Sequence, residues 1–348
     1  MTAQTKKIRT YSGIFLGVAA LAATASELVT DLLVREAMDR AEPRIMKKGK
    51  RRISGNKAKR KANGADSTPD LEREPLNTVR VEITASDGTT LVGHWCPCEA
   101  PKRIVLAMHG WRSSWVSDFG AISEFLHDSG CSVLYVEQRA IGESGGRYIG
   151  FGMLERYDCL DWLGWINEHG GKTLPIYLCG VSMGATTVML AAGLELPENV
   201  HGVIADCGFT SANDIWRHVC TAHLHLPYVT RAGRISAKCR SRIGFDPADV
   251  STTEALRACN TPVLFIHGSE DHFVPSAMTC RNFAASSGPK RMIFVSGAGH
   301  AESYSVDPRK YEAALTDFWQ ACDVCDTFKE GSICNGNDGS DHAGVYAG

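Results

Sequence analysis

The sequence lacks the succession of apolar runs, each of roughly 20 residues, that a polytopic membrane protein needs. Proline is sparse, with 13 residues among 348, which excludes collagen-like and Pro-rich disordered chains. Two motifs of other chemistries are also missing, since no G-x-G-x-x-G opens a helix after a strand and H-E-x-x-H does not occur. We therefore expect neither a dinucleotide cofactor nor a metal.

Basic and acidic residues are unevenly divided along the chain. Residues 1–62 carry 15 Lys and Arg against 5 Asp and Glu, whereas residues 63–348 carry 22 against 34. Ten of the basic residues lie between Arg44 and Lys61, without interleaved aromatics. This run predicts attraction to an anionic membrane surface and no nucleic-acid binding. A solvated linker without a partner is the alternative.

The N-terminal leader allows two interpretations. An apolar stretch covers residues 11–25, follows three basic residues and ends in Ala-Thr-Ala, as a cleaved signal peptide would. Apolar positions continue to about residue 35, which favours a single membrane-anchoring or interfacial helix. We predict a leader over residues 1–35 and a basic linker over 36–77. Membrane association with a cytoplasmic body is favoured by the downstream charge, and an exported or cell-surface body is the alternative.

The cysteine content argues against a disulfide framework. The chain has 13 cysteines, and an odd number cannot all pair within one chain. Cys131, Cys179 and Cys207 lie within or beside apolar runs, where buried thiols act as small hydrophobic groups. This pattern indicates a reducing compartment for the body. Cys96/Cys98 and Cys322/Cys325 are possible exceptions.

From residue 78 onward, short β-branched runs alternate with amphipathic helical segments. This alternation predicts an α/β fold with a mostly parallel sheet and helices on both faces, and Asp87-Gly88 predicts an initial antiparallel hairpin. The rhythm breaks over residues 211–258, which we interpret as a small helical cap after the sixth strand. Residues 323–348 are rich in Gly, Asn and Asp and are expected to form a disordered tail. The expected strands are 79–84, 90–95, 103–110, 132–138, 175–180, 200–207, 261–268 and 291–297, and the longer expected helices are 116–130, 151–170 and 308–319.

The pattern G-x-S-x-G occurs twice, around Ser144 and around Ser182. A nucleophile elbow needs a strand that runs directly into a tight turn and then a helix. Ser182 has the strand-like PIYLCG before it and the helix-forming MGATTVMLAAG after it. Ser144 follows a polar loop and precedes Gly-Gly-Arg, so we assign it to a structural turn and Ser182 to the nucleophile.

A serine hydroxyl needs a base, and the base needs a group that orients it. Asp271 follows the strand 261–268 and His300 follows the strand 291–297, which gives the order Ser…Asp…His. Loops at the carboxyl ends of parallel strands share one edge of the sheet, so the three side chains can meet there. Glu270 and Asp206 are alternatives for the acid.

The other histidines receive supporting roles. His267 and His272 are expected to support the loop that carries the acid. His218, His223 and His225 are expected to be ordinary polar residues of the cap.

The oxyanion of an acyl-transfer reaction needs two backbone N–H donors. Met183, directly after the nucleophile, would supply one. Trp111, in the loop that follows the strand 103–110, would supply the other. Because both act through the backbone, their side chains should be replaceable.

Five motifs together resemble the α/β-hydrolase superfamily, and within it the serine aminopeptidase and monoacylglycerol-lipase-like branch, which includes membrane-anchored bacterial hydrolases. The motifs are HGW (109–111), EQRAIGES (137–144), GVSMG (180–184), HGSEDHFVP (267–275) and GAGH (297–300). The resemblance covers about residues 78–322. It implies an eight-stranded sheet and a triad of Ser182, His300 and Asp271. Relatives usually carry Gly in place of Ala140, and Glu137 and Ile141 also depart from the pattern, all within a structural turn.

These observations predict a serine hydrolase that cleaves carboxylic esters through an acyl-enzyme. An aminopeptidase with the same triad is the first alternative. Residues 212–258 hold seven Lys and Arg against four Asp and Glu, which suits a neutral or anionic substrate better than a substrate ammonium. A non-catalytic, membrane-tethered binding protein of the same fold is the second alternative, and it is disfavoured because every catalytic position is filled.

Overall fold

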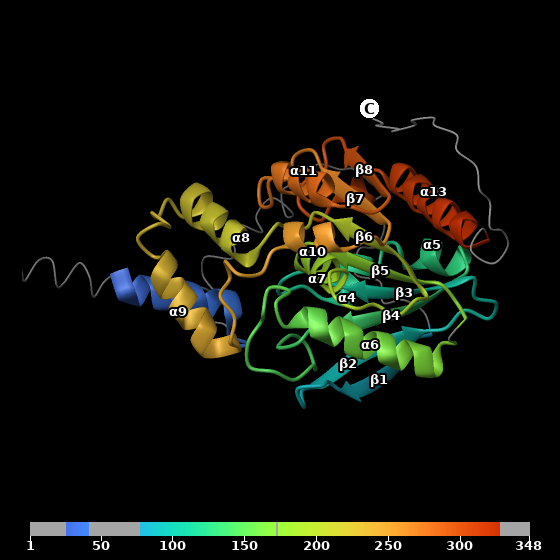
Figure 1. The fold of residues 1–348 in the computed structure, drawn as a ribbon, viewed down its shortest axis with the longest axis horizontal. Helices are drawn as coiled ribbons and strands as arrows, with labels where there is room; N and C mark the ends of the chain where they lie inside the picture. Colours follow the sequence, from blue (N-terminus) through green and yellow to red (C-terminus); the bar gives the residue numbers. More distant parts are fainter. Residues whose placement is uncertain (1–25, 42–76, 172, 328–348) are drawn as a thin grey trace, which may run out of the picture.

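The structure, a computed structural model, describes residues 26–41, 77–171 and 173–327. Its centre is an eight-stranded sheet with the strand order β1-β2-β4-β3-β5-β6-β7-β8 (Figure 1). The predicted α/β-hydrolase fold is confirmed. The strands are β1 Val79–Thr84, β2 Thr90–Cys96, β3 Arg103–Met108, β4 Cys131–Glu137, β5 Ile176–Val181, β6 Val200–Asp206, β7 Val263–Gly268 and β8 Lys290–Val295.

The sheet begins with the expected hairpin. β1 and β2 pair antiparallel, and in the turn between them Gly88 has a φ of +84° and donates its N–H to Ala85 O at 2.8 Å. β2 also runs antiparallel to β4, whereas every pairing from β4 to β8 is parallel. The carboxyl ends of β3, β5, β6, β7 and β8 therefore lie at one edge of the sheet, where the site is built.

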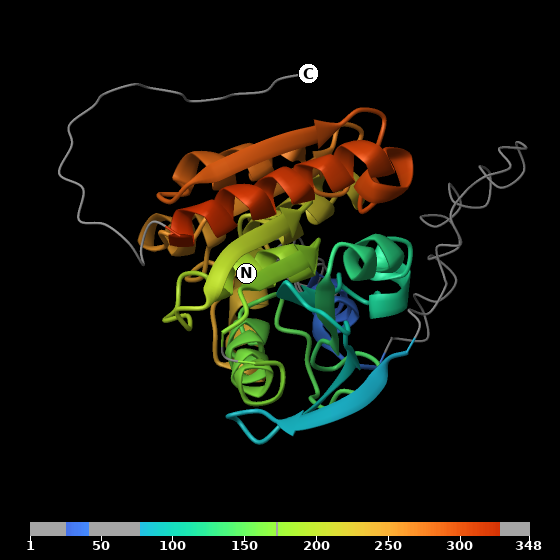
Figure 2. The same ribbon diagram turned by 90° about the vertical axis from the view of Figure 1, so that its right-hand side faces the viewer.

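Helices cover both faces of the sheet. On one face α6 (Glu155–His169), α7 (Met183–Ala191) and α10 (Thr252–Ala258) enclose a core that includes Trp162 and Leu256. On the other face α4 (Trp115–Phe119), α5 (Ser123–Asp128) and α13 (Pro308–Thr327) enclose a second core. Figure 2 shows α6 and the α4–α5 pair on opposite sides of the sheet. β3 and β5 are buried along their whole lengths, as strands covered on both faces should be.

Some boundaries differ from those expected. The predicted helix 116–130 is broken into α4 and α5 at Gly120. α6 begins later than predicted because Phe151 and Gly152 have φ values of +53° and +89°, which a helix cannot contain. α13 continues to Thr327, past the predicted domain end at residue 322, and Asp323 accepts a hydrogen bond from the hydroxyl of Tyr177 at 2.8 Å.

The excursion after β6 forms a cap of three helical segments. These are α8 (Ala212–His218), the π-helical turn η2 (Val219–His223) and α9 (Ala232–Ile243). α10 falls within the predicted cap range, but it packs beside α7 and α11 (Ser276–Ala285) and therefore belongs to the layer over the sheet (Figure 1).

A helix over residues 26–38, blue in Figure 1, packs beside α9. Thr30, Val34 and Met38 recur at the i, i+4 spacing of one helix face, and each is at most 2% exposed. Residues 36–41, which the sequence analysis assigned to a linker, are thus part of the folded body. Val34 and Met38 of this helix pack in the same core cluster as residues of the cap.

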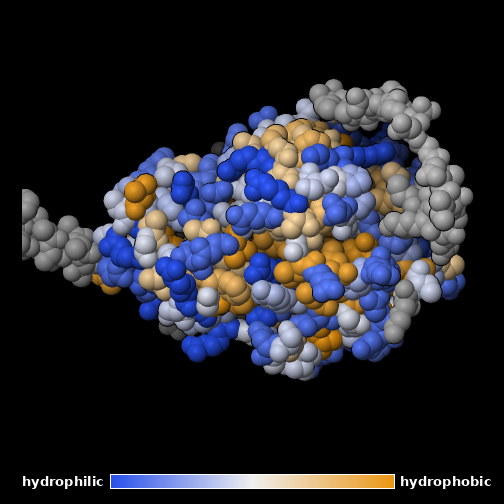
Figure 3. Space-filling view, viewed as in Figure 1, coloured by the Kyte–Doolittle hydropathy of each residue, from blue (hydrophilic) through white to orange (hydrophobic). Residues whose placement is uncertain are grey.

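No helix within the described ranges is long and apolar enough to cross a membrane. The apolar stretch 11–25, most of the linker 36–77 and most of the tail 323–348 lie outside the described residues. Hydrophilic residues cover much of the face seen in Figure 3, and apolar residues occur in smaller groups between them. Cys131, Cys179 and Cys207 carry buried thiols that form no disulfide.

Candidate active site

Ser182 sits in the tight turn between β5 and α7. Its φ and ψ are 55° and −114°, a strained conformation for a residue with a side chain. Gly180 and Gly184 of its motif are required because other backbone segments lie too close to leave room for a side chain. A Cβ on Gly180 would lie 2.3 Å from the carbonyl carbon of Gly184, and a Cβ on Gly184 would lie 1.8 Å from Met108 O. The sequence G-x-S-x-G at 180–184 thus has the strand–turn–helix geometry that a nucleophile elbow needs.

Ser182, His300 and Asp271 meet at the carboxyl edge of the sheet. The Ser182 Oγ lies 2.8 Å from His300 Nε2, and His300 Nδ1 lies 2.7 Å from Asp271 Oδ2. With the carboxylate as acceptor, Nδ1 carries the hydrogen, which leaves Nε2 free to accept the hydroxyl proton of Ser182. The imidazole of His300 is 23% exposed, whereas the carboxylate of Asp271 is fully buried.

The carboxylate of Asp271 is held by four donors. The backbone N–H groups of Phe273 and Val274 each donate to Oδ1 at 2.9 Å, while His267 Nε2 lies 3.3 Å from Oδ2, the oxygen that also bonds to His300. Burial alone would raise the pKa of Asp271, but the hydrogen bonds from His267 and His300 outweigh it and hold that pKa well below its usual range. Asp271 is therefore an anion throughout the neutral range.

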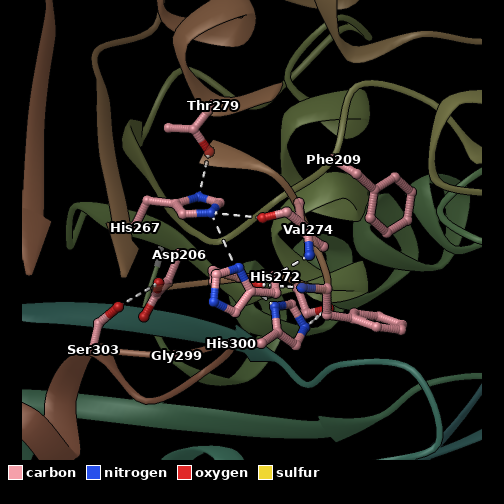
Figure 4. A network of polar contacts seen from close by, with 12 residues as sticks. Asp206, Phe209, His267, His272, Val274, Thr279, Gly299, His300 and Ser303 are labelled. Carbon is pink, nitrogen blue, oxygen red and sulfur yellow. Dashed lines mark hydrogen bonds and ion pairs between the residues drawn. The ribbon is translucent and has the colours of Figure 1, made fainter. Parts of the chain in front are cut away.

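His267 supports this loop, as expected from the sequence (Figure 4). Its Nδ1 lies 2.7 Å from the hydroxyl of Thr279 and its Nε2 lies 3.0 Å from Val274 O. A carbonyl can only accept, so Nε2 carries the hydrogen that faces both Val274 O and Asp271. His272 is exposed, and its carbonyl oxygen accepts from the Nε2 atoms of His218 and His223, which tie the cap to the loop.

The loop after β3 lies directly against Ser182. A Cβ added to Gly110 would lie 3.3 Å from Ser182 Cβ, which is a tight contact, so glycine favours this close approach of the chain. The Gly110 N–H donates to Asp118 Oδ2 at 2.7 Å, and His109 Nδ1 lies 2.8 Å from Gly110 O. Burial lowers the pKa of His109 and keeps the ring neutral. Residues 109–111 are thus held beside the elbow.

Comparisons with known proteins bear on the fold and the family. The family model described as serine aminopeptidase, S33, matches residues 99–242. Together with the fold, this match supports membership of the α/β-hydrolase superfamily. It is 26% identical to the uncharacterised protein YqkD of Bacillus subtilis over 257 residues, which cover 74% of this chain and 83% of that protein. It is 24% identical to the uncharacterised protein YfhR of Escherichia coli K12 over 240 residues, or 67% and 76% of the two chains.

Solved structures share the fold of this hydrolase. The Pyrococcus furiosus esterase Pf2001 superposes with a TM-score of 0.57 at 22% identity, covering 74% of this chain and 95% of that one. DcsB, solved in complex with its substrate analogue, superposes with a TM-score of 0.56 at 19% identity, covering 71% of this chain and all of that one.

The second G-x-S-x-G motif of the hydrolase lies away from this site. The hydroxyl of Ser144 is buried, accepts from Val92 N at 2.9 Å and donates to Glu137 O. These contacts fix the turn after β4 to the start of the sheet. Ala140 in this turn has a φ of +60°, a left-handed conformation that favours glycine, and its methyl group packs in the core beneath the cap.

The alternative acids of the hydrolase do not pair with His300. Glu270 lies 3.9 Å from the exposed ring of His272. Asp206 is buried and accepts a hydrogen bond from Ser303 Oγ at 3.0 Å. A cavity of about 30 Å³, roughly enough for one water, lies against Asp206 on the α13 side of the sheet and is too small for a substrate.

Burial raises the pKa of Asp206 to about 6. Between about pH 4 and pH 6 the folded state therefore binds a proton that the unfolded state releases, so stability falls as pH rises through this window. We expect the difference in unfolding free energy between Asp206→Asn and the parent to grow by roughly 2–3 kcal/mol from pH 4 to pH 7 and to level off above. Urea unfolding across this range measures it. A constant difference would mean that Asp206 is already ionised at pH 4.

In the described ranges, one cluster of three side chains could in principle bind a metal ion, and it consists of Cys207, Asp271 and His300. Asp271 and His300 already bond to each other, and burial holds the pKa of the Cys207 thiol well above its usual value. A metal ion there would have to displace the hydrogen bond between the other two.

Two residues that position the site, Gln138 and Asp118, were not predicted from the sequence. Gln138 donates to His109 O and accepts from Thr187 Oγ1 at 3.2 Å, which joins the loop after β3 to α7. Asp118 accepts from Gly110 N, as described above. The sequence offered two signals. Gln138 is a polar residue at the end of an apolar strand, and Asp118 is a carboxylate in the first turn of a helix.

Proposed function

We propose that this hydrolase cleaves carboxylic esters through a covalent acyl-enzyme on Ser182. The proposal rests on one observation, the continuous hydrogen-bonded line from Asp271 through His300 to Ser182 Oγ, with contacts of 2.7 and 2.8 Å. A serine so placed can lose its proton to Nε2 as its oxygen attacks a carbonyl carbon.

The reaction then follows in two halves. Ser182 Oγ bonds to the carbonyl carbon, and His300 Nε2 holds the proton that the hydroxyl released. The carbon–oxygen bond to the alcohol breaks, and His300 returns this proton to the leaving oxygen. Water then attacks the acyl-enzyme, gives a proton to His300, and the acid leaves as Ser182 regains its hydrogen.

Met183 and Trp111 would stabilise the oxyanion through their backbone N–H groups. Met183 is the first residue of α7, where the N–H has no partner within the helix. Trp111 follows Gly110, which lies against Ser182. Loss of one such donor costs about 10²–10³ in kcat in comparable enzymes.

An apolar acyl group fits the surroundings of these residues. The ring of Phe273 lies 5.0 Å from that of His300, and Phe151 lies between Trp111 and Trp216, at ring distances of 6.3 and 5.0 Å. These aromatic side chains reach from the loop after β3 to the cap.

The ion pairs of the cap weaken the argument from its charge against an aminopeptidase. Its basic helix α9 is matched by acidic residues, most of them in the N-terminal segment, and the ion pairs account for much of the surplus found in the sequence. The pairs are Arg234–Glu27 at 3.6 Å, Lys238–Glu27 at 2.9 Å, Arg240–Asp246 at 3.0 Å and Arg242–Asp39 at 3.1 Å. The match to the serine aminopeptidase model therefore keeps an aminopeptidase as the second candidate.

Two assays separate the candidates. We expect a fluorophosphonate probe to label Ser182, p-nitrophenyl esters of graded chain length to be hydrolysed, and aminoacyl p-nitroanilides to be turned over at least tenfold more slowly. Faster anilide turnover would favour the aminopeptidase. Absence of labelling in the folded protein would favour a non-catalytic binding protein. Attachment to an anionic membrane through the leader and the basic run 44–61 stays a prediction from the sequence.

A further inference from the structure

The loop that carries Trp111 is bonded to a helix far away in the sequence. The indole Nε1 of Trp111 donates to Ala37 O at 2.8 Å. The guanidinium of Arg112 donates through Nη2 to Glu36 O at 2.8 Å and to Asp39 O at 2.5 Å. The side chain of Trp111, which the sequence suggested was replaceable, therefore has a specific partner.

These three carbonyls need such partners because the helix over residues 26–38 ends there. The last i→i−4 hydrogen bond of this helix runs from Asp39 N to Arg35 O at 2.9 Å. The next N–H, that of Arg40, donates instead to Arg147 O at 3.0 Å. The last carbonyls of a helix have no partner within it and carry partial negative charge. The indole N–H of Trp111 and the guanidinium of Arg112 supply hydrogen-bond donors to these carbonyls, and the guanidinium also supplies a positive charge.

The same bonds restrain a strained part of the loop. Arg112 has a φ of +49°, in the left-handed region, which costs a non-glycine residue about 1–2 kcal/mol. Such a conformation persists only where the surroundings hold it. Asp118 fixes the loop at Gly110, and the bonds to residues 36–39 fix it on the other side of the Trp111 N–H.

The helix is itself bonded to the body and the cap, so it provides a fixed support. Arg40 Nη2 donates to Gly142 O at 2.7 Å, and Ile149 N donates to Met38 O at 2.7 Å. Met38 is fully buried, with its sulfur 3.5 Å from the Cys239 thiol of α9. In Figure 1 the helix lies against α9, beside the end of the sheet that carries the site.

We propose that residues 26–41 are an integral part of the active site, because they hold the Trp111 N–H in the direction that stabilises the oxyanion. Trp111 and Arg112 act through their side chains as positioning residues. This inference rests on the proposed ester hydrolysis. It makes turnover depend on a segment that the motifs of the family do not include.

Two single substitutions test it without removing the helix. Trp111→Phe keeps a ring but loses the N–H, and Arg112→Gln loses the charge and most of the donors. We expect kcat for a p-nitrophenyl ester to fall about 10- to 100-fold, less than the 10²–10³ of a lost donor, with KM within about twofold. Arg35→Gln, an exposed arginine of the same helix with a side chain 55% exposed, is the matched control and should keep kcat.

A second readout separates positioning from loss of folded protein. A trifluoromethyl ketone forms a tetrahedral adduct with an oxyanion, so its inhibition constant should rise by the same factor as kcat/KM falls. Active-site titration with a fluorophosphonate normalises the rates to folded enzyme. If normalised kcat and the inhibition constant match the parent in both variants, the loop does not need these bonds and the inference is wrong.

Truncation provides the independent test. A chain starting at Ser26 should match the full chain on a soluble ester, whereas one starting at residue 42 should lose at least tenfold in kcat. A synthetic peptide of residues 26–41 should restore turnover to the shorter chain. If the two truncated chains turned over the ester equally fast, with or without the peptide, the inference would be wrong. A full chain that neither hydrolyses esters nor reacts with the fluorophosphonate would instead overturn the proposed function.

Discussion

Replacing Ser182 with alanine is expected to lower kcat for p-nitrophenyl ester hydrolysis by about 10⁴–10⁶-fold. The substitution removes the oxygen that lies 2.8 Å from His300 Nε2, so no acyl-enzyme can form. Alanine can occupy the tight turn, although a φ of 55° stays strained for it, so the fold should persist. Initial rates, together with the loss of fluorophosphonate labelling, measure the effect.

Ser144→Ala is the matched control because it changes the same residue type in the same G-x-S-x-G pattern. It removes the hydrogen bonds to Val92 N and Glu137 O and should destabilise the protein by about 1–3 kcal/mol. Turnover per folded molecule should be unchanged. If Ser144→Ala abolished turnover and labelling while Ser182→Ala kept both, the nucleophile would have been assigned to the wrong motif.

Much of the fold and the meeting of the three side chains could be predicted from the sequence, because both follow from local patterns. Buried parallel strands read as continuous apolar runs, and each is followed by a loop at the same sheet edge. Ser182, Asp271 and His300 each stand directly after or close behind such a run. Topology alone therefore brings them to one edge, where their side chains make contact.

The contribution of residues 26–41 could not be predicted in this way. The segment precedes the motif-bearing body and is separated from it by a long basic stretch. The i, i+4 spacing of Val34 and Met38 indicates an amphipathic helix but does not say which surface buries it. The hydrogen bonds from Trp111 and Arg112 go to backbone carbonyls, which every residue has. The residue types at positions 36–39 therefore could not have predicted these bonds.

The sequence did not decide which of two buried acids at neighbouring strand ends, Asp206 or Asp271, orients the histidine. Asp206 ends β6 and Asp271 lies on the loop after β7, and both positions can face a histidine. The structure pairs His300 with Asp271 because the turn at residues 271–274 directs two backbone N–H groups at its carboxylate. Asp206 instead accepts from Ser303.

Asp271→Asn is expected to lower kcat by about 10⁴-fold, with little change in KM. Phe273 N and Val274 N both donate to the position of Oδ1, so the amide oxygen must take that place. The amide nitrogen then faces His300 Nδ1 and donates to it. This forces the remaining imidazole hydrogen onto Nε2, where it points at Ser182 and prevents the ring from accepting the hydroxyl proton.

The amide nitrogen would also face the Nε2 hydrogen of His267, so some loss of stability is expected, and rates must be normalised to folded protein. Asp206→Asn is the matched control. It neutralises a second buried acid at the same sheet edge without touching His300, and it should lower kcat less than tenfold. An Asp271→Asn enzyme that kept more than about a tenth of the parent kcat would refute the role of Asp271. A 10⁴-fold loss in Asp206→Asn alone would transfer that role to Asp206, because only an acid that orients the base can cost so much turnover.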